Sequence, residues 1–111
     1  MQQLTVTIGR GAPEARNHIA SASRWAEFQQ EADALVRRHG YDIVGQWTGT
    51  GEWEDQVEQN YHVVGVRDQR FEARVDALTR EVGELAHVYG QDAVALGVGS
   101  SYLVDGEGNR S

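Results

Sequence analysis

The sequence predicts an α+β domain in which four strands form one antiparallel sheet and two helices cover one of its faces. Two segments repeat apolar residues at steps of three and four, which is typical of helices with a single buried stripe. Four other segments are rich in β-branched residues and alternate or run apolar, as half-buried strands do. The chain has 111 residues, which is an ordinary length for one domain.

The first strand is predicted at QLTVTIG, residues 3–9, where apolar side chains alternate with threonines. This period of two predicts one buried face. The next segment, residues 10–21, is polar, has no period and contains the only proline of the chain. It predicts a loop of about ten residues, a length at which loops are often functional or mobile.

The first helix is predicted from about Ser23 to His39. Ser21 or Ser23 can cap its start, and Gly40 suits the position after its end. Its apolar side chains fall on one face and are Trp25, Phe28, Ala32, Leu35 and Val36.

Two strands and a turn follow this helix. YDIVGQW and NYHVVGVRD are predicted as strands, joined by the glycine-rich, acidic segment TGTGEWEDQVEQ. Parity along the first of them puts Tyr41, Ile43 and Trp47 on one side. Because Ile43–Val44 and Val63–Val64 are adjacent apolar pairs, alternation leaves open which side faces the helices.

The second helix is predicted from about Gln69 to Tyr89, followed by Gly90. Its apolar residues recur at steps of four and three and are Phe71, Val75, Leu78, Val82, Leu85 and Tyr89. The fourth strand is predicted at QDAVALGV, residues 91–98. We place the domain at residues 1–104 and expect residues 105–111 to be a disordered polar tail.

The order β-α-β-β-α-β, with one apolar stripe on each helix, predicts a ferredoxin-like sandwich. Both helices then cover the same face of the sheet, and the other face stays open. We expect Thr5, Thr7 and the small side chains Ala93, Ala95 and Gly97 to line this open face. Small residues beside aromatic ones have the shape of a pocket or a dimer interface.

The amino-acid composition limits the classes of function that are expected. The net charge is −7 and Arg37–Arg38 is the only adjacent basic pair, so direct binding to nucleic acid is not expected. The absence of cysteine excludes disulfides and Cys-ligated zinc. The sequence has neither an apolar run near the ~20 residues that span a bilayer nor a signal-peptide pattern. We therefore expect a cytoplasmic protein with no membrane partner and no cofactor.

Candidate binding residues gather on the hairpin. Trp47 and Trp53 flank its turn, and tryptophan is favoured at binding hot spots. Tyr61 and His62 are neighbours in the third strand, and His62 is the histidine to test as an acid or base. Glu52 belongs to an acidic cluster whose spacing differs from that of a calcium loop. The structural alternative is that the indoles pack the hairpin and the acids are solvated.

We predict no catalytic residue and no metal ligand. The sequence contains no nucleophile elbow, no phosphate-binding glycine loop and no paired zinc-ligand motif. Short motifs do stand out: Trp25 with Phe28, Gly45-Gln46-Trp47, Glu58 before a strand, and YGQDAV from Tyr89. In these motifs the sequence resembles a family of small bacterial domains of unknown function, with W-x-x-F, G-Q-W and Y/F-G-Q-x-x-V signatures. The resemblance implies the same fold and no particular activity.

Three functions remain open. The first is a small acidic binding or assembly module that is homodimeric through the open sheet face, so that its partner is itself or another protein. The second is a phage-type acidic inhibitor of a host nucleic-acid-binding defence protein, motivated by small size and negative charge. The third is a small-ligand binding protein or an enzyme that uses the open face, as dimeric ferredoxin-like barrels do.

Overall fold

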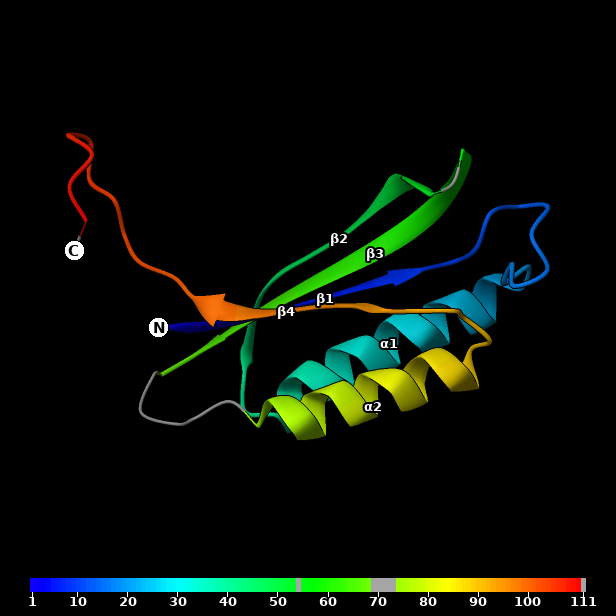
Figure 1. Cartoon of the computed structure of the whole chain (residues 1–111), viewed down its shortest axis with the longest axis horizontal. Helices are drawn as coiled ribbons and strands as arrows, with labels where there is room; N and C mark the ends of the chain where they lie inside the picture. Colours follow the sequence, from blue (N-terminus) through cyan, green and yellow to red (C-terminus); the bar gives the residue numbers. More distant parts are fainter. Residues whose placement is uncertain (54, 69–73, 111) are drawn as a thin grey trace.

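The computed structural model describes residues 1–53, 55–68 and 74–110 and leaves the side chain of Trp53 undescribed. The elements are β1 (Gln2–Gly9), α1 (Ala22–Arg38), β2 (Asp42–Trp53), β3 (Gln56–Arg67), α2 (Val75–Val88) and β4 (Ala95–Ser100). The strands form one antiparallel sheet in the order β2-β3-β1-β4. The two helices lie side by side on the same face of this sheet (Figure 1). The predicted α+β fold is confirmed, and the strand order is that of a ferredoxin-like sandwich.

The core lies between the sheet and the helices. Leu4, Val6 and Ile8 of the central strand β1 are fully buried, as the alternation predicts. Each such side chain contributes about 1.5–3 kcal/mol when it leaves water. The predicted face of α1 is also confirmed, since Trp25, Phe28, Ala32, Leu35 and Val36 are its buried residues.

Local signals fix the ends of α1. The side chain of Ser21 accepts a hydrogen bond from the backbone N–H of Arg24 at 3.2 Å, which satisfies one of the free donors at the helix start. At the other end, Gly40 has a φ of +81°, a backbone conformation that favours glycine. The helix therefore begins one residue before the predicted Ser23 and ends one residue before the predicted His39, with Gly40 in the expected place after the C-cap.

A β-bulge overturns one prediction about β2. Ile43 pairs with Gly65 and Gly45 pairs with Val64, so that Val44 is an extra residue in the strand. An extra residue reverses the parity of everything that follows it. Tyr41 therefore faces the helices and is buried, whereas Trp47 is on the open face and half exposed. The expected grouping of Tyr41, Ile43 and Trp47 on one side is wrong.

The second half of the chain differs from the predicted boundaries. α2 begins at Val75, and the predicted helical residues Gln69–Ala73, with Phe71, lie outside the described residues. β4 begins at Ala95 and not at Gln91, because the Gln91 side chain ties the preceding segment to other parts of the chain. Its Nε2 donates hydrogen bonds to the carbonyl of Asn17 at 2.8 Å and to that of Tyr89 at 3.1 Å.

A short turned segment follows β4. Residues 105–110, which the sequence led us to expect as a disordered tail, form a turn closed by an antiparallel bridge between Val104 and Arg110. Asp105 holds the turn because its Oδ1 accepts hydrogen bonds from the N–H groups of Glu107 and Asn109, at 3.0 and 2.8 Å. Carboxylates commonly stabilise turns in this way. Ser111 lies outside the described residues.

Candidate ligand-binding site

A row of polar side chains crosses the open face of the sheet. His62 of β3 lies between Trp47 of β2 and Thr7 of β1 in the strand register. Its ring stacks on the Trp47 indole, with centroids 4.9 Å apart and planes inclined by 20°. Its Nδ1 is 2.9 Å from the Thr7 hydroxyl, and its Nε2 is 3.0 Å from Oδ1 of Asn60. Contacts on three sides hold this imidazole in one orientation.

The tautomer of His62 follows from these contacts. The Asn60 carbonyl oxygen only accepts, so the Nε2 of a neutral ring must carry the proton. The Thr7 hydroxyl then donates to Nδ1. Both ring nitrogens are thus engaged in hydrogen bonds, and the indole of Trp47 is the exposed part of this row.

Glycines make the floor on which the next side chains lie. Glu58 and Asn60 share the face of His62, because they stand at alternate positions of the same strand. A Cβ atom on Gly9 would lie 2.4 Å from Oε1 of Glu58, and one on Gly51 would lie 2.7 Å from Nδ2 of Asn60. Any larger residue at these positions would push the carboxylate and the amide off the sheet. The glycines thus allow polar groups to lie flat on the open face.

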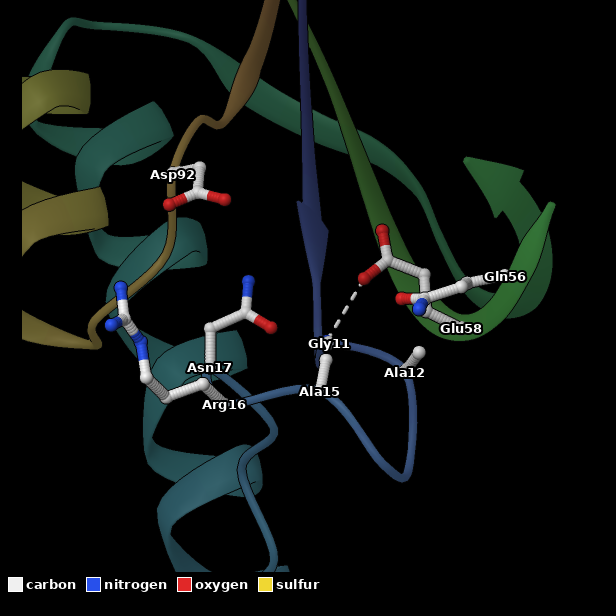
Figure 2. A pocket seen from close by; sticks show the side chains of 8 residues that line it. All are labelled: Gly11, Ala12, Ala15, Arg16, Asn17, Gln56, Glu58 and Asp92. Carbon is white, nitrogen blue, oxygen red and sulfur yellow. Dashed lines mark hydrogen bonds between the residues drawn. The ribbon is translucent and has the colours of Figure 1, made fainter. Parts of the chain in front are cut away.

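Glu58 leads from this face into a pocket beyond the end of β1, which we call the end pocket (Figure 2). Its volume is about 240 Å³. It is lined by Gly11, Ala12, Ala15, Arg16, Asn17, Gln56, Glu58 and Asp92. β1 stops at Gly9, while β3 extends beyond it. The pocket occupies the space that this early stop leaves.

Glu58 is fixed at the wall of the end pocket. Its Oε2 accepts a hydrogen bond from the backbone N–H of Gly11 at 2.9 Å. Figure 2 shows Asp92 on the other side of the pocket, with Asn17 between the two carboxylates. Arg16 is the one cationic side chain among the lining residues. With these groups ionised, the lining carries a net charge of about −1, which favours a positively charged group in the pocket.

The long loop that forms the pocket is held by hydrogen bonds inside the loop and by a hydrogen bond from Gln91. Arg10 donates from Nε to the carbonyl of Ile19 at 2.7 Å, and Nδ1 of His18 is 2.8 Å from the carbonyl oxygen of Gly11. Gly11 itself has a φ of +81°, and a Cβ there would lie 2.8 Å from Oδ1 of Asn17. The bond from Gln91 to Asn17 anchors the loop from the far side. These contacts make the pocket part of the folded domain.

The structure separates the residues that the sequence put together. Trp47 and His62 are in contact on the open face. Tyr61 faces the helices instead and is only 6% exposed. Glu52 pairs with Val57, one position from the pair of Gly51 and Glu58, so it points to the opposite side of the hairpin from Glu58. The side chain of Trp53 lies outside the described residues.

Tyr61 has a structural role in this arrangement. Its hydroxyl donates a hydrogen bond to Oδ1 of Asp33 on α1 at 2.7 Å. Burial, and after it the hydrogen bond to Asp33, raises the pKa of Tyr61 to about 12. A neutral phenol is therefore kept between sheet and helix, away from the open face.

Sequence reasoning missed Glu58, Asn60 and Asp92 as site residues. Two signals were available. Glu58 and Asn60 alternate with the buried Tyr61 and Val63, which assigns them to the face of His62. Three glycines, at positions 9, 49 and 51, stand in strands where a side chain is expected. Asp92 reaches the end pocket through the tertiary fold, and no local sequence pattern indicates this position.

Two general searches of the described residues gave nothing further. Among residues 1–53, 55–68 and 74–110, no group of three or more His, Asp or Glu side chains is arranged to hold a metal ion. Neither described helix is long and apolar enough to cross a membrane.

Comparisons with known proteins show the fold alone. No protein-family model matches the chain, and no curated protein sequence does. Two similar structures are of phage SAM lyase. The ligand-free one has a TM-score of 0.51, 14% identity, and covers 88% of this chain and 78% of that one. The complex with S-methyl-5′-thioadenosine has a TM-score of 0.53, 12% identity, and covers 89% and 80%.

A third structure is formyltetrahydrofolate deformylase from Burkholderia mallei ATCC 23344, with a TM-score of 0.47 and 17% identity over 89% of this chain. The match spans only 27% of that protein. At these identities the likeness to the phage enzyme reports a shared chain fold.

Proposed function

We propose that this protein binds a small ligand that carries both a positive charge and a flat aromatic ring. The charge would lie in the end pocket and the ring on Trp47. The proposal depends on one observation: two carboxylates, Glu58 and Asp92, lie on two sides of the end pocket. Arg16 is the one cationic side chain among the residues that line it. Carboxylates on two sides of a pocket attract cations, and a nearby indole face stacks on rings or cations.

The dimensions of the site support a ligand in two parts. The end pocket, at about 240 Å³, is smaller than the sites that enclose a drug-sized molecule. It suits a head group the size of an amino acid. From Glu58 to His62, on which Trp47 stacks, there are four residues of extended strand, or about 13 Å. A ligand that reaches from pocket to indole would lie along β3 on the glycine floor.

S-adenosylmethionine is the first compound to test. It combines a sulfonium, an ammonium and an adenine ring in one molecule of about this length. The likeness in fold to phage SAM lyase guides the choice of the compound, and the contacts above guide the position. S-methyl-5′-thioadenosine is the matched control ligand, because it keeps the ring and lacks the charged part.

Isothermal titration calorimetry with both compounds tests the proposal. We expect S-adenosylmethionine to bind more tightly. Glu58→Gln keeps an oxygen that accepts from the Gly11 N–H, so the fold is preserved while the charge is lost. Loss of a charged contact is expected to weaken binding of S-adenosylmethionine about tenfold or more and to leave that of the control ligand unchanged. Glu84→Gln on the outer surface of α2 should change neither.

The ring contact is tested separately. Trp47→Ala should weaken the binding of both compounds by similar factors, since stacking of one base on an aromatic side chain contributes about 1–3 kcal/mol of binding free energy. Equal affinity of the two compounds, or an unchanged affinity in the Glu58→Gln variant, would contradict the proposal. So would the absence of heat with either compound at millimolar concentration.

Homodimerisation through the open face, the first expectation from the sequence, would use the same surface. We favour the ligand because the part of this face around His62 carries threonine, asparagine and a carboxylate beside glycines, with the half-exposed Trp47. Interfaces of stable homodimers are more apolar than this.

The acidic-inhibitor alternative has less support. Carboxylates of the described chain occur on α1, on α2, on the β2–β3 hairpin and beyond β4. Arg24 and Arg38 approach Glu27 and Glu81 on the helical face, at 3.7 and 3.6 Å. A mimic of nucleic acid needs its negative charges concentrated on one surface.

A further inference from the structure

The chain leaves the domain after β4 as a projecting segment, residues 101–110, which we call the C-terminal arm. In Figure 1 the arm runs beyond the end of the sheet and away from both helices. Three of its side chains are apolar and exposed: Tyr102 at 54%, Leu103 at 78% and Val104 at 59%. Arg110 lies over the Tyr102 ring, 4.0 Å from its centroid. Exposed apolar side chains on an ordered projection are unfavourable unless something covers them.

A groove of about 920 Å³ lies between α2 and β4 in the same chain. Its apolar lining comprises Val75, Val82, Ala86, Val94, Leu96 and Val98. β4 is at the edge of the sheet, and within the described part of the chain no strand pairs with its outer side. An exposed edge beside an apolar groove is the kind of surface to which another strand adds.

We propose that the C-terminal arm of a second copy of this chain fills the groove, and that the two copies exchange arms reciprocally. The outer edges of the two β4 strands would pair antiparallel about a two-fold axis at Ser100. In that register Tyr102 lies opposite Val98 of the partner and Val104 lies opposite Leu96. This inference goes beyond the ligand site and does not depend on it.

The parity of the strand supports the pairing. Leu96 and Val98 turn toward the helices and pack against the core. Tyr102 and Val104 stand at even-numbered positions of the same chain segment, so in an extended strand they turn the same way. Paired as above, they would enter the groove of the partner. In its own chain the arm runs away from both helices, including α2, which forms one side of the groove (Figure 1).

Charge is also complementary. The groove end lined by Val75 and Val98 adjoins Asp76, the acidic residue in the first turn of α2. Because Tyr102 would lie opposite Val98, the Arg110 that covers its ring would come next to Asp76 of the partner. Each chain has a net charge of −7, so two copies repel each other at long range. Local contacts of opposite charge then select the position in which they meet.

Crosslinking through a single cysteine tests the register, because the chain has no cysteine of its own. Ser100→Cys places two thiols face to face at the axis. We expect it to form a disulfide-linked dimer on mild oxidation of the full chain. Thr50→Cys, also at an exposed position, is the matched control and should remain monomeric on a denaturing gel. Equal crosslinking of the two variants overturns the proposal.

Sedimentation at 1–100 µM tests the contacts, at concentrations typical of weak dimers. We expect a dimer whose dissociation constant rises at least about tenfold with Tyr102→Glu, as for a buried aromatic anchor. Arg110→Glu should weaken it as well, and adding Asp76→Arg to that variant should restore it. These positions are exposed, so the variants should fold. A monomer throughout the range, or a dimer that Tyr102→Glu leaves intact, overturns the proposal.

Discussion

Two glycines, Gly65 and Gly83, differ in whether the surrounding structure leaves space for a side chain. Gly65 in β3 is buried between the helix and the sheet, and a Cβ there would lie 2.6 Å from Cγ1 of Val36 and 2.7 Å from Cβ of Tyr41. Neither neighbour can withdraw easily, because both belong to the core. Gly83 in α2 has nothing within 4 Å of such an atom.

We therefore predict that Gly65→Ala destabilises the fold by about 1–3 kcal/mol, which is the usual cost of overpacking a core. Gly83→Ala should stabilise it by about 0.5–1 kcal/mol, because alanine favours a helix. Urea denaturation followed by circular dichroism measures both. If the two substitutions had the same effect, the close packing of β3 on α1 would be wrong.

Tyr61 gives a prediction about alkaline pH. Its pKa of about 12 in the folded state lies above the value of about 10 in an unfolded chain. The folded state then keeps a proton that the unfolded state releases. The stability from this group is complete below pH ~10 and is lost as pH rises towards ~12.

In a titration followed by tyrosinate absorbance, we expect a late component that Tyr61→Phe removes. The fall in stability between pH ~10 and ~12 should be smaller in the Tyr61→Phe variant. A late component that persists in this variant would assign it to another tyrosine.

The burial of single residues was predictable from the sequence where only one set of alternating or helix-spaced positions was apolar. The face of α1 from Trp25 to Val36 and the buried alternation of β1 were confirmed, because one set of positions was apolar and the other was not. The face of Tyr61 stayed open in the sequence for the opposite reason. Its neighbour His62 is also amphipathic. Nothing in the local sequence shows that Tyr61 bonds to Asp33 on the helix side while His62 stacks on Trp47 on the open face.

The bulge at Val44 gives a prediction about an element. Val44 is the extra residue of β2, 62% exposed, and the pairs on both sides of it already continue in register. Removing it would leave an uninterrupted ladder with Trp47 still opposite His62. We predict that deletion of Val44 preserves cooperative unfolding at a cost on the order of 1 kcal/mol.

Deletion of Thr5 is the matched control, because β1 has no bulge. Losing one residue there turns either Leu4 or the pair of Val6 and Ile8 to the open face. We expect that variant to lose its cooperative transition in urea. If deletion of Val44 were as damaging as deletion of Thr5, the bulge would have a structural function of its own.

The elements themselves were largely predictable and their edges were not. Order, number and type followed from periods of two and of three to four residues. The bulge escaped notice because Ile43 and Val44 are both apolar, so that an inserted residue leaves no break in the pattern. The start of β4 was placed too early because Gln91 is fixed by a bond to Asn17, far away in the sequence.

At the scale of the molecule, the candidate site depends on contacts between distant segments. Glu58 reaches Gly11 across 47 positions, and Gln91 reaches Asn17 across 74. No local pattern encodes such approaches. The open face was predicted correctly as the side that the helices leave bare, whereas the end pocket follows from where β1 stops relative to its neighbours.

The position of β1 has a consequence for how the protein is made. β1 is an inner strand of the sheet, and both of its neighbours, β3 and β4, are synthesised after it. Residues 2–9, with their buried apolar side, therefore lack one pairing partner in the nascent chain until β4 has been synthesised. Pairing across such separations is slow and leaves apolar surface exposed meanwhile, so the sheet of this domain is completed only after β4 has left the ribosome.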